Sequence, residues 1–550
     1  MKHRSVKRRT VLLGIGATAG AAAVGGIALN AAASGDKSSK TPGSLAFDKD
    51  AYTEKTITIT DAEGTDHVVV YHFWKPITYV TKPVDTDHQT LVVSVPVKID
   101  GKAVDATNAP IVFANAVGGY FPATVKDATG VGEAQMEMGG AGPGGGNGGP
   151  GGGSGGPSGS PSPGGDGSAN DMTGAMGDRV SLPKLSLAAG YVVVEPGCRG
   201  RTLTNSDGEY YGTAPAAIVD LKAAVRYVRA NKGVIPGNTD RIVSTGTSAG
   251  GALSSLLGAS GDSRIYDKYL KELGAAHASD AIHATGAWCP ITDLENADGA
   301  YEYCWGTNAT QGTGRTVDQT VVKELRSQFA DYQASLKLKG VDGFGVLTGR
   351  NYDAYLLEAY MEPAATTYLK SLSDSERTTY LGKNSFITWK NGRATFDWAG
   401  YAAHVGARKK SAPAFDAFDL SSGENNLFGL GTTESRHFTA YSAKKDTAGL
   451  PTKRVASDIP EKLRLMNPMY HIGQRNPGRS RHWWLRVGTN DTDSSPVIVS
   501  NLAASLAGIG DKVDALMYWD EGHGANIDAG DFIAWVAEVT GGRSKAAKSK

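Results

Sequence analysis

The pattern of hydrophobic positions predicts a chain in which strands alternate with helices. Short β-branched or alternating apolar runs bounded by turn residues are typical of strands. They occur at Thr56–Thr60, Val68–Phe73, Thr90–Val97, Pro110–Ala114, Tyr191–Glu195, Arg241–Thr245, Trp483–Val487 and Val513–Trp519. Apolar residues at helical spacing occupy Ala214–Lys232, the stretch that begins at Ala249, Pro496–Ala507 and Ala525–Val539. Alternation of this kind predicts an α/β fold with a parallel sheet and crossover helices.

The middle of the chain has a different pattern. Between about Cys289 and Glu461, helical stretches at Val321–Leu338 and Tyr352–Ser371 mix with aromatic and glycine-containing loops, without repeated strands. We therefore expect a mostly helical domain inserted over one end of the sheet.

Composition indicates a globular protein with one unusual segment. The 550 residues are 40% hydrophobic, and the 56 basic and 56 acidic residues give a formal charge of zero, which argues against nucleic-acid binding. Glycine is in excess, with 72 residues. Much of that excess lies in residues 139–168, which are mostly glycine and proline and cannot bury apolar surface. We expect a flexible surface loop there.

The N-terminal residues 1–33 have the pattern of a targeting segment. Five basic residues, including the adjacent Arg8 and Arg9, precede a weakly apolar, Ala/Gly-rich run that ends at Ala31-Ala32-Ala33. The pattern resembles a twin-arginine export signal. It predicts passage through the twin-arginine translocase and an extracellular or cell-envelope location, without stable membrane insertion. The alternative is an uncleaved anchor, although the many small residues would partition weakly into lipid.

The three cysteines do not form a recognisable motif. Cys198, Cys289 and Cys304 allow at most one disulfide, for which Cys289 and Cys304 are the pair to test. None has a CxxC neighbour, so the sequence favours buried thiols and predicts no metal or cofactor.

The strongest local signal is Gly246-Thr247-Ser248-Ala249-Gly250, between a predicted strand and a predicted helix. This G-x-S-x-G pattern is a nucleophile elbow, in which glycines permit a tight turn that exposes the serine. Ser248 is the candidate nucleophile. The alternative is a structural glycine-rich turn.

A serine nucleophile needs a histidine base and a carboxylate that orients it. His523 follows the last predicted strand, where this arrangement places the base, whereas His471 and His482 come before the strand that should carry the acid. The loop after Trp483–Val487 offers both Asp491 and Asp493, and spacing alone does not choose between them. Asp493 could instead cap the following helix.

Two backbone N–H groups are candidates for the oxyanion hole. One belongs to Ala249, which follows the nucleophile at a helix N-terminus. The other belongs to Gly119, in the Asn115-Ala116-Val117-Gly118-Gly119-Tyr120 loop after an earlier strand. An ordinary turn is the alternative for this loop.

Several motifs together resemble the bacterial tannase family of α/β-hydrolases. They are NAVGGY, CRGRT, GTSAGGALSSLLGASG, WCPITDLENADGAYEY, PAFDAFDLSSGENNLFG and the GTNDTDSS and DEGHG segments near the end. The resemblance covers the chain after the signal. It implies an α/β-hydrolase fold with an inserted lid domain, and a catalytic triad of Ser248, Asp491 and His523. The glycine tract, the export signal and the DEGHG sequence depart from the family's core pattern.

The resemblance also implies a substrate and its contacts. Tannases hydrolyse galloyl esters, and the positions that match the family's ring-binding residues are Lys410, Glu424 and Asp493. Two carboxylates and an ammonium can hold three phenolic hydroxyls by charge-assisted hydrogen bonds. The alternatives are a feruloyl, chlorogenate or general carboxylesterase on the same fold, and a non-catalytic binding protein.

These expectations divide the chain into seven parts. Residues 34–135, 171–290 and 461–541 form the hydrolase core, and residues 291–460 form the lid. The signal occupies residues 1–33, the glycine-rich insertion residues 136–170, and a basic tail residues 542–550.

Overall fold

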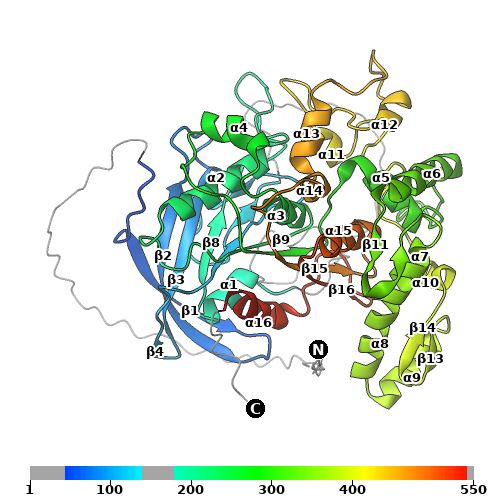
Figure 1. The fold of residues 1–550 in the computed structure, drawn as a ribbon, viewed down its shortest axis with the longest axis horizontal. Coiled ribbons are helices and arrows are strands. Elements are labelled where there is room, and N and C mark those ends of the chain that lie inside the picture. Colours follow the sequence, from blue (N-terminus) through cyan, green and yellow to red (C-terminus); the bar gives the residue numbers. More distant parts are fainter. Residues whose placement is uncertain (1–43, 139–178, 542–550) are drawn as a thin grey trace, which may run out of the picture.

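The computed structural model describes residues 44–138 and 179–541 (Figure 1). The expected signal, most of the glycine-rich insertion and the basic tail lie outside the described residues. Among the described residues, no helix is both long and apolar enough to cross a bilayer.

A ten-stranded sheet crosses the molecule in the order β1-β2-β3-β8-β5-β9-β10-β15-β16, with β4 beside β3. β1, β2, β3 and β8 pair antiparallel, and the pairs from β8 to β16 are parallel. The strands of this sheet are β1 (Tyr52–Thr60), β2 (Asp66–Thr78), β3 (Thr90–Ile99), β4 (Lys102–Ala103), β5 (Ile111–Ala114), β8 (Val192–Pro196), β9 (Ile242–Thr247), β10 (Ala284–Trp288), β15 (His482–Gly488) and β16 (Lys512–Tyr518).

Helices cover both faces of the sheet, because successive side chains of a strand point to opposite sides. On β5, Ile111 and Phe113 join one apolar cluster, while Val112 and Ala114 join the other. The first cluster includes side chains of α2, α3 and α15, and the second includes those of α1 and α16, which lie side by side in Figure 1. These helices are α1 (Leu182–Ala188), α2 (Ala216–Ala230), α3 (Ala249–Ala259), α15 (Pro496–Gly508) and α16 (Ala529–Thr540).

A long segment between β10 and β15 supplies most of the remaining helices (Figure 1). We call this the inserted segment, residues 289–481. Its helices are α5 (Leu294–Trp305), α6 (Gln319–Leu336), η2 (Val341–Gly343), α7 (Tyr352–Leu356), η3 (Leu357–Met361), α8 (Glu362–Ser371), α9 (Asp374–Lys383), α10 (Trp398–Val405), α11 (Gly423–Leu427), α12 (Ala440–Lys444), α13 (Ile459–Met466) and α14 (Pro468–Ile472). Its short strands are β11 (Lys339–Gly340), β12 (Gly345–Val346), β13 (Thr388–Lys390) and β14 (Arg393–Thr395). The predicted α/β architecture with a mostly helical insertion is confirmed.

Elements outside the sheet and the insertion are short. Before β10, two helices connect α3 to it, η1 (Arg264–Tyr266) and α4 (Asp267–Glu272). A separate two-stranded sheet pairs β6 (Ala123–Thr124) with β7 (Gln135–Met136). Strand β10 is not predicted by the sequence pattern, because its residues Ala-Thr-Gly-Ala-Trp lack a β-branched or alternating run. Tertiary burial between β9 and β15 makes it a central strand.

The parallel strands bring their following loops to one edge of the sheet. Ser248 follows β9, Cys289 follows β10, Asp491 comes shortly after β15, and His523 comes shortly after β16. The inserted segment leaves the sheet at this same edge, directly after β10.

Candidate active site

Ser248 occupies a sharp turn between β9 and α3. Its backbone has φ 59° and ψ −123°, a strained conformation for a residue with a side chain. A Cβ on Gly246 would lie 2.3 Å from the carbonyl oxygen of Gly250, and one on Gly250 would lie 2.6 Å from that of Val117. Only glycine fits these two positions, so the sequence pattern and the elbow geometry have the same steric cause.

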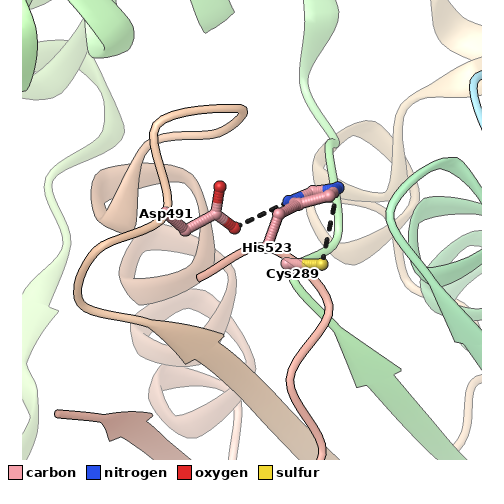
Figure 2. A group of neighbouring side chains, drawn as sticks. All are labelled: Cys289, Asp491 and His523. Carbon is pink, nitrogen blue, oxygen red and sulfur yellow. Dashed lines mark hydrogen bonds and ion pairs between the residues drawn. The ribbon is translucent and has the colours of Figure 1, made fainter. Parts of the chain in front are cut away.

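His523 and Asp491 form the pair that a serine nucleophile requires. Nδ1 of His523 lies 2.8 Å from Oδ2 of Asp491, which is fully buried (Figure 2). The other carboxylate oxygen of Asp491 accepts hydrogen bonds from the backbone N–H groups of Asp493, at 2.9 Å, and Ser494, at 3.2 Å. These bonds fix the carboxylate, and the carboxylate in turn fixes the imidazole ring.

The environment of His523 raises its pKa. Burial alone would lower its pKa, but the charge of Asp491 and the hydrogen bond to it outweigh burial and hold the pKa of His523 well above its usual range. Asp491 thereby stabilises the imidazolium that forms when neutral His523 accepts a proton.

Nε2 of His523 faces a residue that the sequence did not suggest. Sγ of Cys289 lies 3.8 Å from this nitrogen, and Figure 2 marks the contact. Within residues 44–138 and 179–541, no hydrogen bond joins the Ser248 hydroxyl to His523. Their neighbours are nevertheless in contact, since a Cβ on Gly524 would lie 3.2 Å from a methyl group of Thr247. Catalytic hydrogen bonds are often formed only with substrate present.

Backbone contacts place the Cys289 turn against the elbow. The N–H of Ser248 donates to the carbonyl of Trp288 at 2.9 Å, and the N–H of Ile291 donates to the carbonyl of Ser248 at 3.5 Å. All three cysteines are free and buried, so the Cys289–Cys304 pair is not a disulfide in this structure.

The loop with Gly119 packs directly on the elbow. The Gly250 N–H donates to the Val117 carbonyl at 3.0 Å, and the side-chain amide of Asn115 donates to the carbonyls of Thr245 and Gly250. Gly119 has φ 53°, which favours glycine. Among the described residues, neither the N–H of Gly119 nor that of Ala249 donates a hydrogen bond to another backbone group.

Arg201 connects this loop to the inserted segment. Its Nε donates to the carbonyl of Gly119 at 2.7 Å, and its Nη1 donates to the side chain of Asn426, on α11, also at 2.7 Å. The guanidinium carbon lies 4.0 Å from the centre of the Phe121 ring. The CRGRT motif contains Arg201, but only the fold shows what it contacts.

The three expected ring-binding residues have different surroundings. Glu424, on α11, is buried. Its charge lies close enough to Tyr120 and Arg201 to influence the pKa values of both side chains. Burial first, and then the charge of Glu424, raise the pKa of Tyr120. Asp493 forms an ion pair with Lys409, with 2.7 Å between Nζ and Oδ1. The ammonium of Lys410 lies 4.4 Å from the centre of the Phe415 ring.

A tyrosine hydroxyl joins the two loops that carry these groups. The hydroxyl of Tyr301 donates to the carbonyl of Thr492 at 2.6 Å and accepts from the N–H of Lys410 at 3.2 Å. Lys409 and Lys410 are therefore held beside the loop that contains Asp491 and Asp493.

The inserted segment also contacts the loop that carries His523. Asp520 has φ 58° and receives three contacts: Nε2 of His404 at 2.5 Å, the hydroxyl of Tyr380, and, through its own N–H, the hydroxyl of Thr489 at 2.9 Å. No local sequence pattern indicates Tyr380 or His404 as a partner, because α9 and α10 lie more than a hundred residues away along the chain.

Solved structures of known proteins resemble this chain over most of its length. A family model described as BD-FAE matches residues 164–330, and a search of curated proteins found no match. A solved tannin acyl hydrolase in complex with ethyl gallate is 30% identical, with a TM-score of 0.71, and covers 90% of this chain and 99% of its own. Fusobacterium nucleatum tannase is 34% identical, with a TM-score of 0.70, over 90% of this chain and 100% of its own. A tannase from Lactobacillus plantarum is 30% identical, with a TM-score of 0.70 and coverages of 90% and 99%.

The sheet, the elbow after β9 and the insertion after β10 define an α/β-hydrolase. Within that class the chain is a carboxylic ester hydrolase. It belongs to the bacterial tannase family, as the identity and coverage of the solved tannases show.

Proposed function

We propose that this protein is a secreted serine esterase that hydrolyses galloyl esters through Ser248, His523 and Asp491. The main support for the proposal is the His523–Asp491 pair, in which Nδ1 and Oδ2 are 2.8 Å apart. The pair lies at the sheet edge that also carries the strained Ser248 elbow. Membership of the tannase family supports the choice of a galloyl substrate, since one of the solved relatives is described in complex with ethyl gallate.

The reaction proceeds in two halves. Oγ of Ser248 attacks the ester carbonyl while Nε2 of His523 takes the hydroxyl proton, and the N–H groups of Ala249 and Gly119 stabilise the oxyanion. The C–O bond to the alcohol breaks, and His523 returns the proton to the leaving alkoxide. Water then attacks the acyl-enzyme with His523 as base, which releases gallic acid and restores Ser248.

Recognition of the galloyl ring is assigned to Lys410, Glu424 and Asp493, with the inserted segment acting as a lid over the sheet edge. The support is that Lys410 and Glu424 lie on the inserted segment, while Asp493 lies two residues after the triad acid. A ring without hydroxyl groups would leave these charges without partners, which is a strong basis for rejecting it.

Secretion is proposed from residues 1–33, which lie outside the described part of the chain. Replacing both Arg8 and Arg9 by Lys in the full-length chain should prevent twin-arginine export. The measurement is the amount of esterase in the medium of an expressing host, with the unchanged signal as control. Equal amounts in the medium would contradict this route.

The decisive experiment compares methyl gallate, methyl ferulate and methyl benzoate. We expect kcat/KM for gallate to exceed that for benzoate by at least about 100-fold, because each charge-assisted hydrogen bond contributes about 1.5–3 kcal/mol. Ser248→Ala should lose at least about 10⁴-fold in kcat, whereas Cys289→Ala should retain turnover. Similar rates on all three esters would favour a general or feruloyl esterase. No hydrolysis of any ester would favour a non-catalytic binding protein.

A further inference from the structure

Three potential metal ligands meet at the catalytic base. Sγ of Cys289, a carboxylate oxygen of Asp491 and a ring nitrogen of His523 all lie within 4.8 Å of one another (Figure 2). They follow three adjacent strands, β10, β15 and β16, so the sheet itself brings them together. The sequence, with no CxxC motif, predicted no zinc site. We propose that Cys289 Sγ and His523 Nε2 bind a soft divalent cation such as Zn²⁺, and that the bound ion inhibits the esterase.

The spacing of the two ligand atoms fits a bridging ion. With Zn–S of about 2.3 Å and Zn–N of about 2.1 Å, a tetrahedral angle places the sulfur and nitrogen about 3.6 Å apart. The observed separation of Sγ and Nε2 is 3.8 Å. The separation of the two atoms is therefore close to the separation that one bound ion requires.

Asp491 completes the arrangement without being a ligand. Metal-binding histidines usually donate their second ring N–H to a carboxylate, which fixes the ring and raises its basicity. Nδ1 of His523 lies 2.8 Å from Asp491, so in the neutral ring Nε2 carries the lone pair, 3.8 Å from Sγ of Cys289. The same contact that prepares His523 as a catalytic base thus prepares it as a metal ligand.

Binding exchanges protons for a metal ion. The Cys289 thiol releases its proton to solvent, and Nε2 does the same where His523 is protonated. A sulfur–metal bond then forms, and Nε2 donates its lone pair to the ion. Two protein ligands leave positions for water, as expected of a reversible inhibitory site rather than a structural one. While the ion is bound, Nε2 cannot accept the proton of Ser248, so turnover stops. This inference rests on the proposed function, because the inhibited base is the base of that reaction.

The chain offers a matched control. Cys304 is also buried and free, but its Sγ lies 3.4 Å from the hydroxyl of Ser495. No histidine contacts it among the described residues. Cys304→Ala therefore removes a thiol without removing the proposed site.

The test uses the full mature chain, Cys289→Ala and Cys304→Ala, all freed of metal by a chelator. Hydrolysis of 4-nitrophenyl acetate is followed as Zn²⁺ is added, because galloyl esters would themselves chelate the ion. We expect Zn²⁺ to inhibit the parent and Cys304→Ala, with recovery on addition of EDTA. Cys289→Ala should need at least about tenfold more Zn²⁺ for the same inhibition. Equal inhibition of Cys289→Ala would overturn the proposal.

Cadmium binding gives a readout that does not depend on activity. Thiolate coordination of Cd²⁺ produces an ultraviolet charge-transfer band, which we expect in the parent and in Cys304→Ala but not in Cys289→Ala. A band of equal strength in Cys289→Ala would refute the site even if no ester is hydrolysed, so the two proposals fail separately. If Cys289→Ala does not fold, Cys289→Ser keeps the size of the side chain and replaces the soft ligand by a poor one.

Discussion

Nζ of Lys409 lies 2.7 Å from Oδ1 of Asp493, so the carboxylate expected to bind the substrate ring is already paired with a neighbouring ammonium. The adjacent Lys410, the position that matches the family's ring-binding lysine, instead has its ammonium over the ring of Phe415. We therefore expect the two neighbouring lysines to have separable roles, with Lys409 holding Asp493 in place and Lys410 binding the substrate ring.

Replacing the two lysines separately distinguishes these roles. Lys410→Ala should lower kcat/KM for methyl gallate by about 10- to 100-fold and leave methyl benzoate almost unchanged, because a charge-assisted hydrogen bond to the ring is lost. Lys409→Ala should have a smaller effect on the ratio of kcat/KM for methyl gallate to kcat/KM for methyl benzoate. If Lys409→Ala shows the larger loss of gallate preference, the lysine that binds the ring is Lys409.

We expect Arg201 to support stabilisation of the oxyanion, through Gly119, rather than recognition of the galloyl ring. Arg201→Ala removes the hydrogen bonds to the Gly119 carbonyl and to Asn426, so the Gly119 N–H loses its fixed orientation. Loss of one oxyanion donor lowers kcat by about 10²–10³, and a misplaced donor should cost about 10- to 100-fold. The fall should be equal for methyl gallate and methyl benzoate in steady-state assays. A fall confined to gallate would indicate that Arg201 acts through Glu424 instead.

The steric requirement for glycine in the elbow can be tested by comparing an alanine substitution there with one at a glycine elsewhere in the chain. Gly246→Ala would place a methyl group 2.3 Å from the Gly250 carbonyl oxygen, so the turn must open and activity should be lost. Gly508, in α15, has no atom within 4 Å of the position that a Cβ would take, and Gly508→Ala should raise the free energy of unfolding by about 0.5–1 kcal/mol. Denaturant unfolding and ester hydrolysis measure the two effects. An active Gly246→Ala enzyme would argue against the elbow.

A buried histidine linked to α11 through Asp416 should make the stability of the fold depend on pH. His437 lies between Asp416, 2.7 Å from Nδ1, and Asp446, 3.1 Å from Nε2. Asp416 in turn accepts from the side chain of Asn425, next to Glu424. Burial lowers the pKa of His437, but the hydrogen bonds and charges of Asp416 and Asp446 raise it above 6.5 overall. Lys453, at 2.9 Å from Asp446, also faces this cluster.

The sign of the effect follows from that pKa. Because the folded-state pKa of His437 is higher than its unfolded value, its stabilising effect is fully present below about pH 6.5 and is lost as pH rises through the folded value. The melting temperature of His437→Gln should therefore differ most from that of the parent at about pH 6, and the gap should narrow at higher pH. Thermal melts from about pH 6 to 9 measure this. A gap that widens with pH would contradict the assignment.

Local features of the active site could be predicted because their causes are local. The steric requirement for Gly246 and Gly250, the strand before them and the helix after them are all properties of neighbouring residues. His523 was predicted from its place after the last strand. The choice of Asp491 over Asp493 came from the family resemblance, and the structure bonds Asp491, rather than Asp493, to His523.

Contacts between segments that are distant along the chain could not be predicted from the sequence. Cys289 and His523 are 234 residues apart, Lys409 and Asp493 are 84 apart, and Arg201 and Gly119 are 82 apart. By itself, the sequence determined the alternation of strands and helices and the glycine pattern of the elbow, because backbone sterics and side-chain periodicity act over a few residues. Only the tertiary structure decided which atom faces Nε2 of His523 and which lysine pairs with Asp493. Those contacts depend on how the parallel strands and the inserted segment pack at one edge of the sheet.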